Sequence, residues 1–197
     1  MRFSNREIKE LFVAWLMISL AFAILFSGGA SSLLSPSFTF VLSLIISAFT
    51  VGISFLFHEL MHKYVAQKYG LWAEFRAFYK MLWLALLFSF FGFIIAAPGA
   101  VMIRGFLSKE KNGKISLAGP LTNIVLALIF FVPLLFYKEG ISGLFFSYGF
   151  KINSLLALFN LIPTLPFDGA KVYLWSKTIY IIAVVFALLL FLSTYLI

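Results

Sequence analysis

Long uncharged stretches dominate this chain. No charged residue lies between Glu10 and His58, and further uncharged stretches cover residues 81–103, 115–137, 152–167 and 178–197. Most of them are long enough to cross a bilayer, which takes about 20 apolar residues in a helix. Charged residues make up only 11 % of the chain, whereas about a quarter is usual in soluble domains. The sequence therefore predicts a multi-pass membrane protein and excludes an ordinary soluble domain.

Basic residues exceed acidic ones by 15 to 7, and cysteine is absent. Cationic residues collect in the cytoplasmic loops of membrane proteins. Since no aromatic-interleaved basic stretch or nucleic-acid motif accompanies them, we expect no nucleic-acid partner. Without thiolates, any metal ion must be held by His, Asp or Glu side chains.

Five apolar segments are long enough for transmembrane helices. We expect them at about residues 11–27, 38–70, 115–137, 142–161 and 177–197. The first resembles a secretory signal, because basic residues precede it, but its length favours a retained helix. Residues 109–114 are expected to form a basic turn, and the segment around Asp168 an inner loop.

Residues 81–103 are also long enough to span the membrane, but they contain Gly92, Pro98 and Gly99. A single crossing would leave the basic residues at 104–114 outside, whereas a re-entrant hairpin keeps them inside with a cytoplasmic N-terminus. We therefore expect extended β structure in part of this stretch, chiefly over residues 92–103, and a short interfacial helix over 80–91 stays open as an alternative. The predicted fold is an all-α polytopic membrane protein with about five transmembrane helices and a small re-entrant β element between the second and third.

The only two histidines of the chain form the sequence His58-Glu59-Leu60-Met61-His62. On a helix, the i, i+4 spacing brings both imidazoles to one face, as in the H-E-x-x-H motif of zinc hydrolases. Two polar residues merely tolerated at a helix end would be the plainer explanation. However, an ionisable side chain in a transmembrane segment costs about 2.5 to 3.5 kcal/mol on insertion scales, which favours a functional site.

A catalytic zinc ion usually has three protein ligands, so one more must come from elsewhere. Asp168 follows a helix expected to run inward, and it therefore reaches the same membrane face as the histidines. Glu110 lies in a charged turn and is expected to pair with a lysine, while Glu139 falls on the opposite face. Glu74 remains open as an alternative ligand on this reasoning.

Two further motifs accompany the histidine pair, Ala118-Gly119-Pro120-Leu121-Thr122-Asn123 and the sequence from Asn160 to Gly169, NLIPTLPFDG. Together, the three motifs resemble those of the site-2 protease family of intramembrane zinc metalloproteases, over about residues 38–175. The resemblance implies one Zn²⁺ per chain, with Asp168 as the third ligand beside the histidines and Glu59 as the catalytic base.

The resemblance also implies that Asn123 and Asn160 lie near the site and bind substrate. The alternative for each asparagine is a hydrogen bond between helices. Ala170 departs from the family pattern, where many members have a second glycine. We expect residues 1–197 to form a single membrane-embedded protease domain, without a PDZ or CBS domain.

The predicted activity is that of a zinc metalloendopeptidase that hydrolyses peptide bonds within or near transmembrane segments of other membrane proteins. Its partners would be those substrates and the lipid bilayer, and its active site would lie towards the cytoplasmic side. One alternative is a zinc transporter or sensor, although transport calls for a series of intramembrane ligands. A second alternative is an inactive relative that only binds transmembrane helices. The intact Glu59 argues against it, because binding alone does not require a catalytic base.

Overall fold

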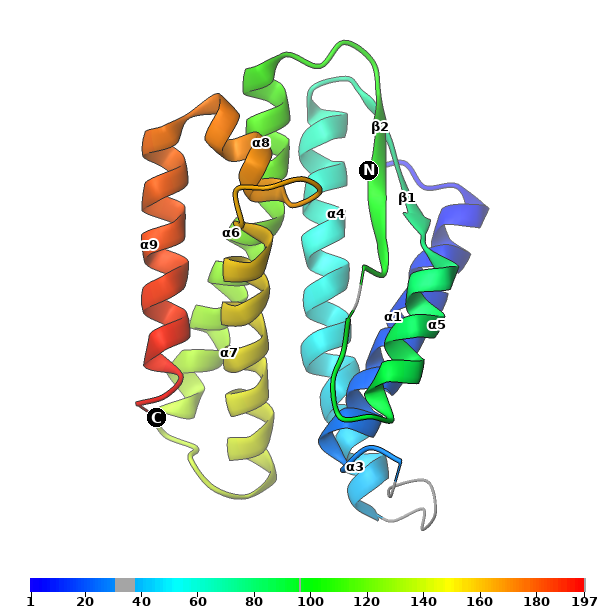
Figure 1. The fold of residues 1–197 in the computed structure, drawn as a ribbon, viewed down its shortest axis with the longest axis vertical. Coiled ribbons are helices and arrows are strands. Elements are labelled where there is room, and N and C mark those ends of the chain that lie inside the picture. Colours follow the sequence, from blue (N-terminus) through cyan, green and yellow to red (C-terminus); the bar gives the residue numbers. More distant parts are fainter. Residues whose placement is uncertain (31–37, 96, 197) are drawn as a thin grey trace. The chain divides into compact units, whose positions relative to one another are not determined.

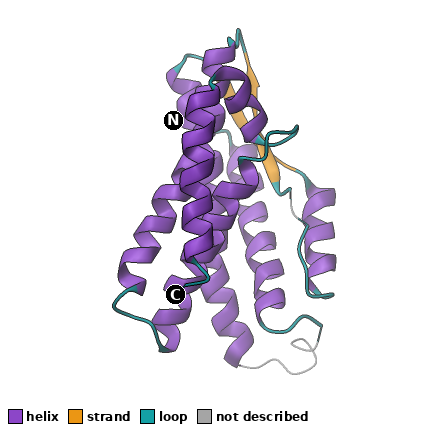
Figure 2. Cartoon of the chain, turned by 60° about the vertical axis from the view of Figure 1, so that its left-hand side comes forward, coloured by secondary structure: helices purple, strands orange, loops and turns teal. Residues whose placement is uncertain are grey.

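The computed structural model describes residues 1–30, 38–95 and 97–196. The chain forms two compact units. The first consists of residues 57–73 and 103–197, together with Met1, and the second of residues 2–56 and 74–102. Helices make up most of the described chain, and both strands belong to one small sheet (Figure 2).

In the second unit, α1 (Asn5–Phe26) packs against α3 (Phe38–Ser47), the π-helical turn η1 (Ala48–Gly52) and α5 (Tyr79–Ser89). Ser4 begins α1 by accepting a hydrogen bond from Glu7 N at 3.1 Å. Gly52 allows α1 to approach η1, because a Cβ there would overlap the side chains of Trp15 and Ser19. Small residues commonly allow such close helix packing in membrane proteins.

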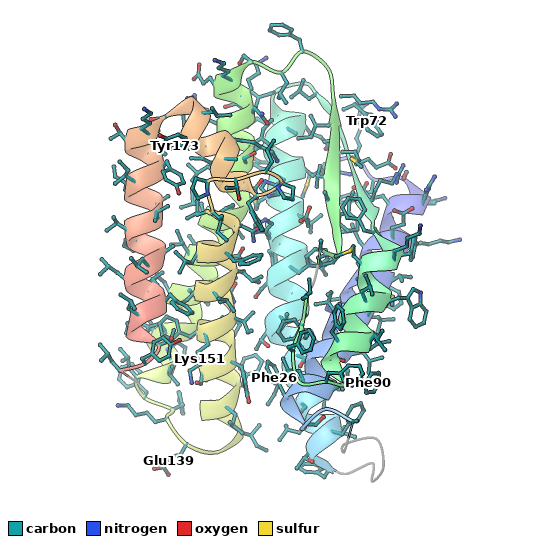
Figure 3. The ribbon with its side chains drawn as sticks, viewed as in Figure 1. Phe26, Trp72, Phe90, Glu139, Lys151 and Tyr173 are labelled. Atoms are coloured by element: carbon teal, nitrogen blue, oxygen red, sulfur yellow. The ribbon has the colours of Figure 1, made fainter. Side chains whose placement is uncertain are left out.

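At the other end of α1, the chain meets the end of α5. Ala30 N donates to Phe90 O at 3.2 Å, and Figure 3 labels Phe26, the last residue of α1, and Phe90, which follows α5. The short helix that the sequence left open over residues 80–91 is observed as α5, with nearly the same bounds.

The sheet pairs β1 (Trp72–Ala77) with β2 (Gly99–Arg104). Phe78 N donates to Pro98 O at 2.9 Å, and Gly99 lies against Arg76 O, so the strands run antiparallel. The expected β structure over residues 92–103 is correct only from Gly99 onwards. Residues 92–95, 97 and 98 are not part of a strand, and Ala96 lies outside the described residues. The partner strand β1 was not predicted, and the re-entrant course of this segment stays a prediction.

Two carboxylates of α1 accept hydrogen bonds from backbone N–H groups of β1. Glu7 Oε1 accepts from Phe75 N at 2.8 Å, and Glu10 Oε2 accepts from Ala77 N at 2.9 Å. Glu7 and Phe75 are almost completely buried. Alternate residues of a strand point their N–H groups to the same edge, so these two glutamates occupy the edge of β1 that β2 does not use.

The first unit contains most of α4 (Ile53–Lys68) together with α6 (Lys109–Leu134), α7 (Gly140–Asn160), α8 (Asp168–Trp175) and α9 (Lys177–Ser193). Helices α6, α7 and α9 pack side by side (Figure 1). A cluster of Ile124, Ala157, Leu161 and Ala187 forms part of their core. Gly149 brings α7 close to α6, because a Cβ there would overlap the ring of Phe130.

The expected turn over residues 109–114 is wrong, because these residues form the first turns of α6. Ser108 caps this helix by accepting from Lys111 N at 3.3 Å. Glu110 pairs with Lys114 at 2.5 Å across one turn, which confirms its expected role as the partner of a lysine. Local capping and an i, i+4 ion pair both favour helix here.

The expected inner loop around Asp168 is likewise only partly correct, since Asp168 opens the short helix α8. Among the residues that the structure describes, four helices are long and apolar enough to cross a membrane: Asn5–Phe26, Phe38–Lys68, Lys109–Leu134 and Gly140–Asn160. The last helix, α9, is apolar but has only 17 residues. The fold is thus mostly helical with a small sheet, as predicted, while a fifth spanning helix stays a prediction.

The contact between Glu7 and β1 predicts a difference between two substitutions of similar volume. Glu7→Leu leaves the buried N–H of Phe75 without this acceptor, whereas Glu7→Gln keeps an oxygen there. We expect Glu7→Leu to be less stable than Glu7→Gln by about 1 to 3 kcal/mol. Thermal unfolding in detergent measures this difference, and amide exchange of residues 72–77 locates it. Equal exchange in the two variants would contradict this role of Glu7.

Candidate metal centre

Helix α4 carries the histidine pair. His58 and His62 are one turn apart, and both are buried. Their Nε2 atoms lie 3.0 Å from each other, with the ring centroids 4.6 Å apart. The helical spacing predicted from the sequence therefore places two potential ligand atoms side by side.

Asp168 completes the group from the first residue of α8. Its Oδ2 atom lies 3.4 Å from His58 Nε2 and 3.0 Å from His62 Nε2, and the three ligand atoms all lie within 4.8 Å of one another. Gly169 allows this position, because a Cβ there would overlap the backbone of Leu161 and Ile162. The α7–α8 connection thus folds back tightly enough to bring Asp168 to the histidines.

The other ring nitrogens of both histidines meet oxygen atoms. His58 Nδ1 lies 2.6 Å from Asn123 Oδ1, and His62 Nδ1 lies 2.8 Å from Ile115 O. A carbonyl oxygen only accepts, so each Nδ1 donates and the neutral imidazole carries its lone pair on Nε2. The Nε2 lone pairs of His58 and His62 then point towards the carboxylate oxygen Oδ2 of Asp168. These three electron-rich atoms repel one another unless they bind a common cation. The donor set therefore fits a metal ion, and its N/N/O chemistry suits zinc.

Asp168 is held as an anion. Burial raises the pKa of its carboxyl, but the positive charge and hydrogen bonds of the imidazoles in their protonated form, His62 foremost, lower it more, so the net pKa lies well below its ordinary value. Positive charge beside the carboxylate has this effect whether a proton or a metal ion carries it. Lys171 Nζ lies 3.5 Å from Oδ1, while Oδ2 faces the histidines. The carboxylate is therefore ready to act as a ligand.

Gly119 on α6 provides the space next to the ligand atoms. A Cβ at this position would overlap Nε2 of both His58 and His62. The glycine of the Ala118-Gly119-Pro120 motif is therefore required by the close approach of α6 to the imidazoles, which the sequence alone did not explain.

The remaining predicted site residues have different positions. Asn123 is fully buried and contacts His58, while its role in binding substrate stays a prediction. The amide of Asn160 instead donates to Leu156 O of its own helix at 2.9 Å. Glu59 is buried beside His58.

Glu74, the alternative ligand, is outside the metal-binding group found among the described residues and binds Arg76 at 2.7 Å and Ser4.

Asn153 is a site residue that the sequence analysis missed. It is fully buried on α7, and its Oδ1 accepts from Asn123 Nδ2 at 3.0 Å. An amide in an apolar helix was the available signal, because such groups need a partner inside the protein.

Comparison with known proteins gives relatives named as zinc metalloproteases. The chain is 46 % identical over 185 residues to "Putative zinc metalloprotease MJ0611" of Methanocaldococcus jannaschii, covering 92 % of this chain and 90 % of the relative. The chain belongs to this family of zinc metalloproteases. "Putative zinc metalloprotease YwhC" of Bacillus subtilis is 34 % identical, with 62 % of this chain and 65 % of the relative covered.

A third relative, "Zinc metalloprotease MJ0392" of Methanocaldococcus jannaschii, is 31 % identical over 61 % of this chain but only 31 % of its own length. No family profile and no solved structure matches the chain. The prediction of zinc as cofactor is confirmed by the names of the relatives and by a group able to hold one metal ion.

The position of Gly119 predicts the effect of a single methyl group. Gly119→Ala places a Cβ against both Nε2 atoms, and we expect zinc affinity to fall by about tenfold or more, as is typical of changes beside metal ligands. Gly113→Ala on the same helix is the matched control, because its Cβ would meet the side chain of Trp175 instead. Zinc titration against a chelating dye compares the two variants. Unchanged affinity in Gly119→Ala would contradict the close approach of α6.

Proposed function

We propose that this zinc metalloprotease is an intramembrane endopeptidase of the site-2 type, which cleaves other membrane proteins within or near their transmembrane segments. The observation that carries the proposal is the location of the metal-binding group. Both histidines lie in Phe38–Lys68, a helical segment long and apolar enough to span a membrane. A protease whose ligands are part of a membrane span acts on bonds that reach membrane depth.

The proposed ligands are His58, His62 and Asp168. Bound zinc would supply Lewis acidity, which acidifies water and polarises a peptide carbonyl. The carboxylate of Glu59 would accept the proton from the attacking water and pass it to the leaving amine nitrogen. Ile115 and Asn123 would keep the imidazoles oriented through their oxygens, while burial of the group limits the access of water.

Transport or sensing of zinc is the less favoured function. A transport path calls for several intramembrane ligand sets, whereas the residues described contain one group of metal-ligating side chains. The H-E-x-x-H sequence also includes a carboxylate that a simple metal carrier does not need.

We further propose that the basic end of the first unit faces the cytoplasm. Three lysines of this unit lie over aromatic rings: Lys111 over Tyr69, Lys114 over Trp175 and Lys177 over Tyr173. Aromatic residues concentrate at membrane interfaces, and basic residues on the cytoplasmic side. Both tendencies favour this end as the cytoplasmic interface.

Substitution of Glu59 tests the proposed activity. Glu59→Gln keeps the shape of the side chain but cannot take up the proton, so we expect turnover to fall at least about 100-fold while zinc remains bound. The purified full chain is incubated in liposomes with single-span substrates, with and without a zinc chelator, and zinc content is measured in parallel. The control is Glu110→Gln, the same substitution at a glutamate that forms an ion pair with Lys114.

Two outcomes separate the parts of the proposal. Cleavage by Glu59→Gln at the wild-type rate would show that Glu59 is not the base. Cleavage of soluble peptides alone, with no cut in single-span substrates, would leave a zinc metalloprotease but reject the intramembrane type.

The orientation is tested by cysteine labelling, since the native chain has no cysteine. We expect a cysteine at Lys111 to react with a membrane-impermeant maleimide only after the cells are opened, because basic segments stay on the cytoplasmic side. A cysteine at Glu139, in the connection between α6 and α7 (Figure 3), is the control expected to react from outside. Labelling of Lys111→Cys in intact cells would reverse the orientation.

A further inference from the structure

We propose that Asn153 is a positioning residue of the metal centre, which acts through Asn123 to keep the Nε2 lone pair of His58 available for the metal. The inference rests on the proposed ligand role of His58. It assigns a function to a residue outside the three sequence motifs and changes the role of Asn123 from substrate binding to ligand orientation.

A directed series of hydrogen bonds supports this assignment. Asn153 Nδ2 donates to Gly149 O at 2.8 Å, Asn123 Nδ2 donates to Asn153 Oδ1 at 3.0 Å, and Asn123 Oδ1 lies 2.6 Å from His58 Nδ1. The series begins at a backbone carbonyl, which can only accept.

That carbonyl fixes the direction of every following bond. The NH₂ group of Asn153 must face Gly149 O, so its oxygen faces Asn123. The NH₂ group of Asn123 must then face Asn153, so its oxygen faces His58. An oxygen at Nδ1 requires the proton on Nδ1, and the lone pair of the neutral ring is left on Nε2.

Without Asn153, the amide of Asn123 loses the partner that defines its orientation. A rotated amide would present NH₂ to His58, and Nδ1 would then have to accept. The proton would move to Nε2, the atom nearest His62 and Asp168, where it would block metal binding. His62 does not share this sensitivity, because its Nδ1 faces the backbone oxygen of Ile115 directly.

This series of hydrogen bonds controls the orientation of His58 because its members are buried. Asn123 and Asn153 are both fully buried, and His58 is 6 % exposed. Water is therefore a poor substitute for a missing amide, and a buried polar group without a partner is costly. The series also joins α7 to α6 and α6 to α4, so the position of α7 affects His58 through Asn123.

The experiment compares metal affinity in four forms of the full chain in detergent. Asn153→Ala is expected to bind zinc about 10 to 100 times more weakly than wild type, the range usual for partners of metal ligands. Asn123→Asp combined with Asn153→Ala is expected to restore affinity to within about threefold, because a carboxylate accepts from His58 Nδ1 in either orientation. The control is Ser154→Ala, a buried neighbour whose hydroxyl bonds only Phe150 O of its own helix among the bonds described.

A spectrum provides a second readout. We expect the visible absorption of the cobalt-substituted protein to change in Asn153→Ala, to recover in the double variant and to stay unchanged in Ser154→Ala. Wild-type affinity in Asn153→Ala would overturn the inference, and so would an equal loss in the double variant, since that indicates only a packing defect. Absence of metal binding in the wild type would overturn the proposed site itself, and the inference with it.

Discussion

Polar atoms buried in so apolar a chain must find their partners inside the protein, because a buried polar group without a hydrogen bond is costly. This constraint explains the main polar contacts in both units. In the second unit, Glu7 and Glu10 of α1 accept hydrogen bonds from two backbone N–H groups of β1, which would otherwise be unpaired at the edge of the sheet. In the first unit, the imidazoles of His58 and His62 donate to oxygens of α6. The same requirement thus holds a strand in one unit and orients two candidate ligands in the other.

Much of the helical fold could be predicted from the sequence, because a long uncharged stretch has few alternatives to a membrane helix. The errors fall where local and distant interactions decide. Residues 109–114 were expected to form a turn from their charges, but the cap at Ser108 and the ion pair between Glu110 and Lys114 extend α6 through them. Strand β1 carries no alternating pattern, and its partner β2 is separated from it by α5. Pairing between such distant segments leaves little local signal.

The histidine pair could be predicted because its two members are one helical turn apart, so that local geometry alone brings them together. Asp168 was harder, since spacing left Glu74 open and only the resemblance to a protease family selected between them. The structure places Asp168 Oδ2 within 3.0 Å of His62 Nε2, while Glu74 pairs with Arg76. Asn153 lies in no motif, and its contact with Asn123 depends on how α7 packs against α6. Such a residue becomes visible only once the helices are assembled.

One face of α6 carries the groups that contact the two histidines. Ile115, Gly119 and Asn123 are spaced by four residues and therefore follow one another along the same face of the helix. Ile115 O meets His62, Asn123 Oδ1 meets His58, and Gly119 leaves room for both rings between them. Because His58 pairs with the later position and His62 with the earlier one, α4 and α6 run antiparallel, with matching i, i+4 spacings. A shift of α6 by a single residue would rotate this face by about 100° and move the side chain of Asn123 away from His58 and Gly119 away from both rings, so the site depends on one register of α6.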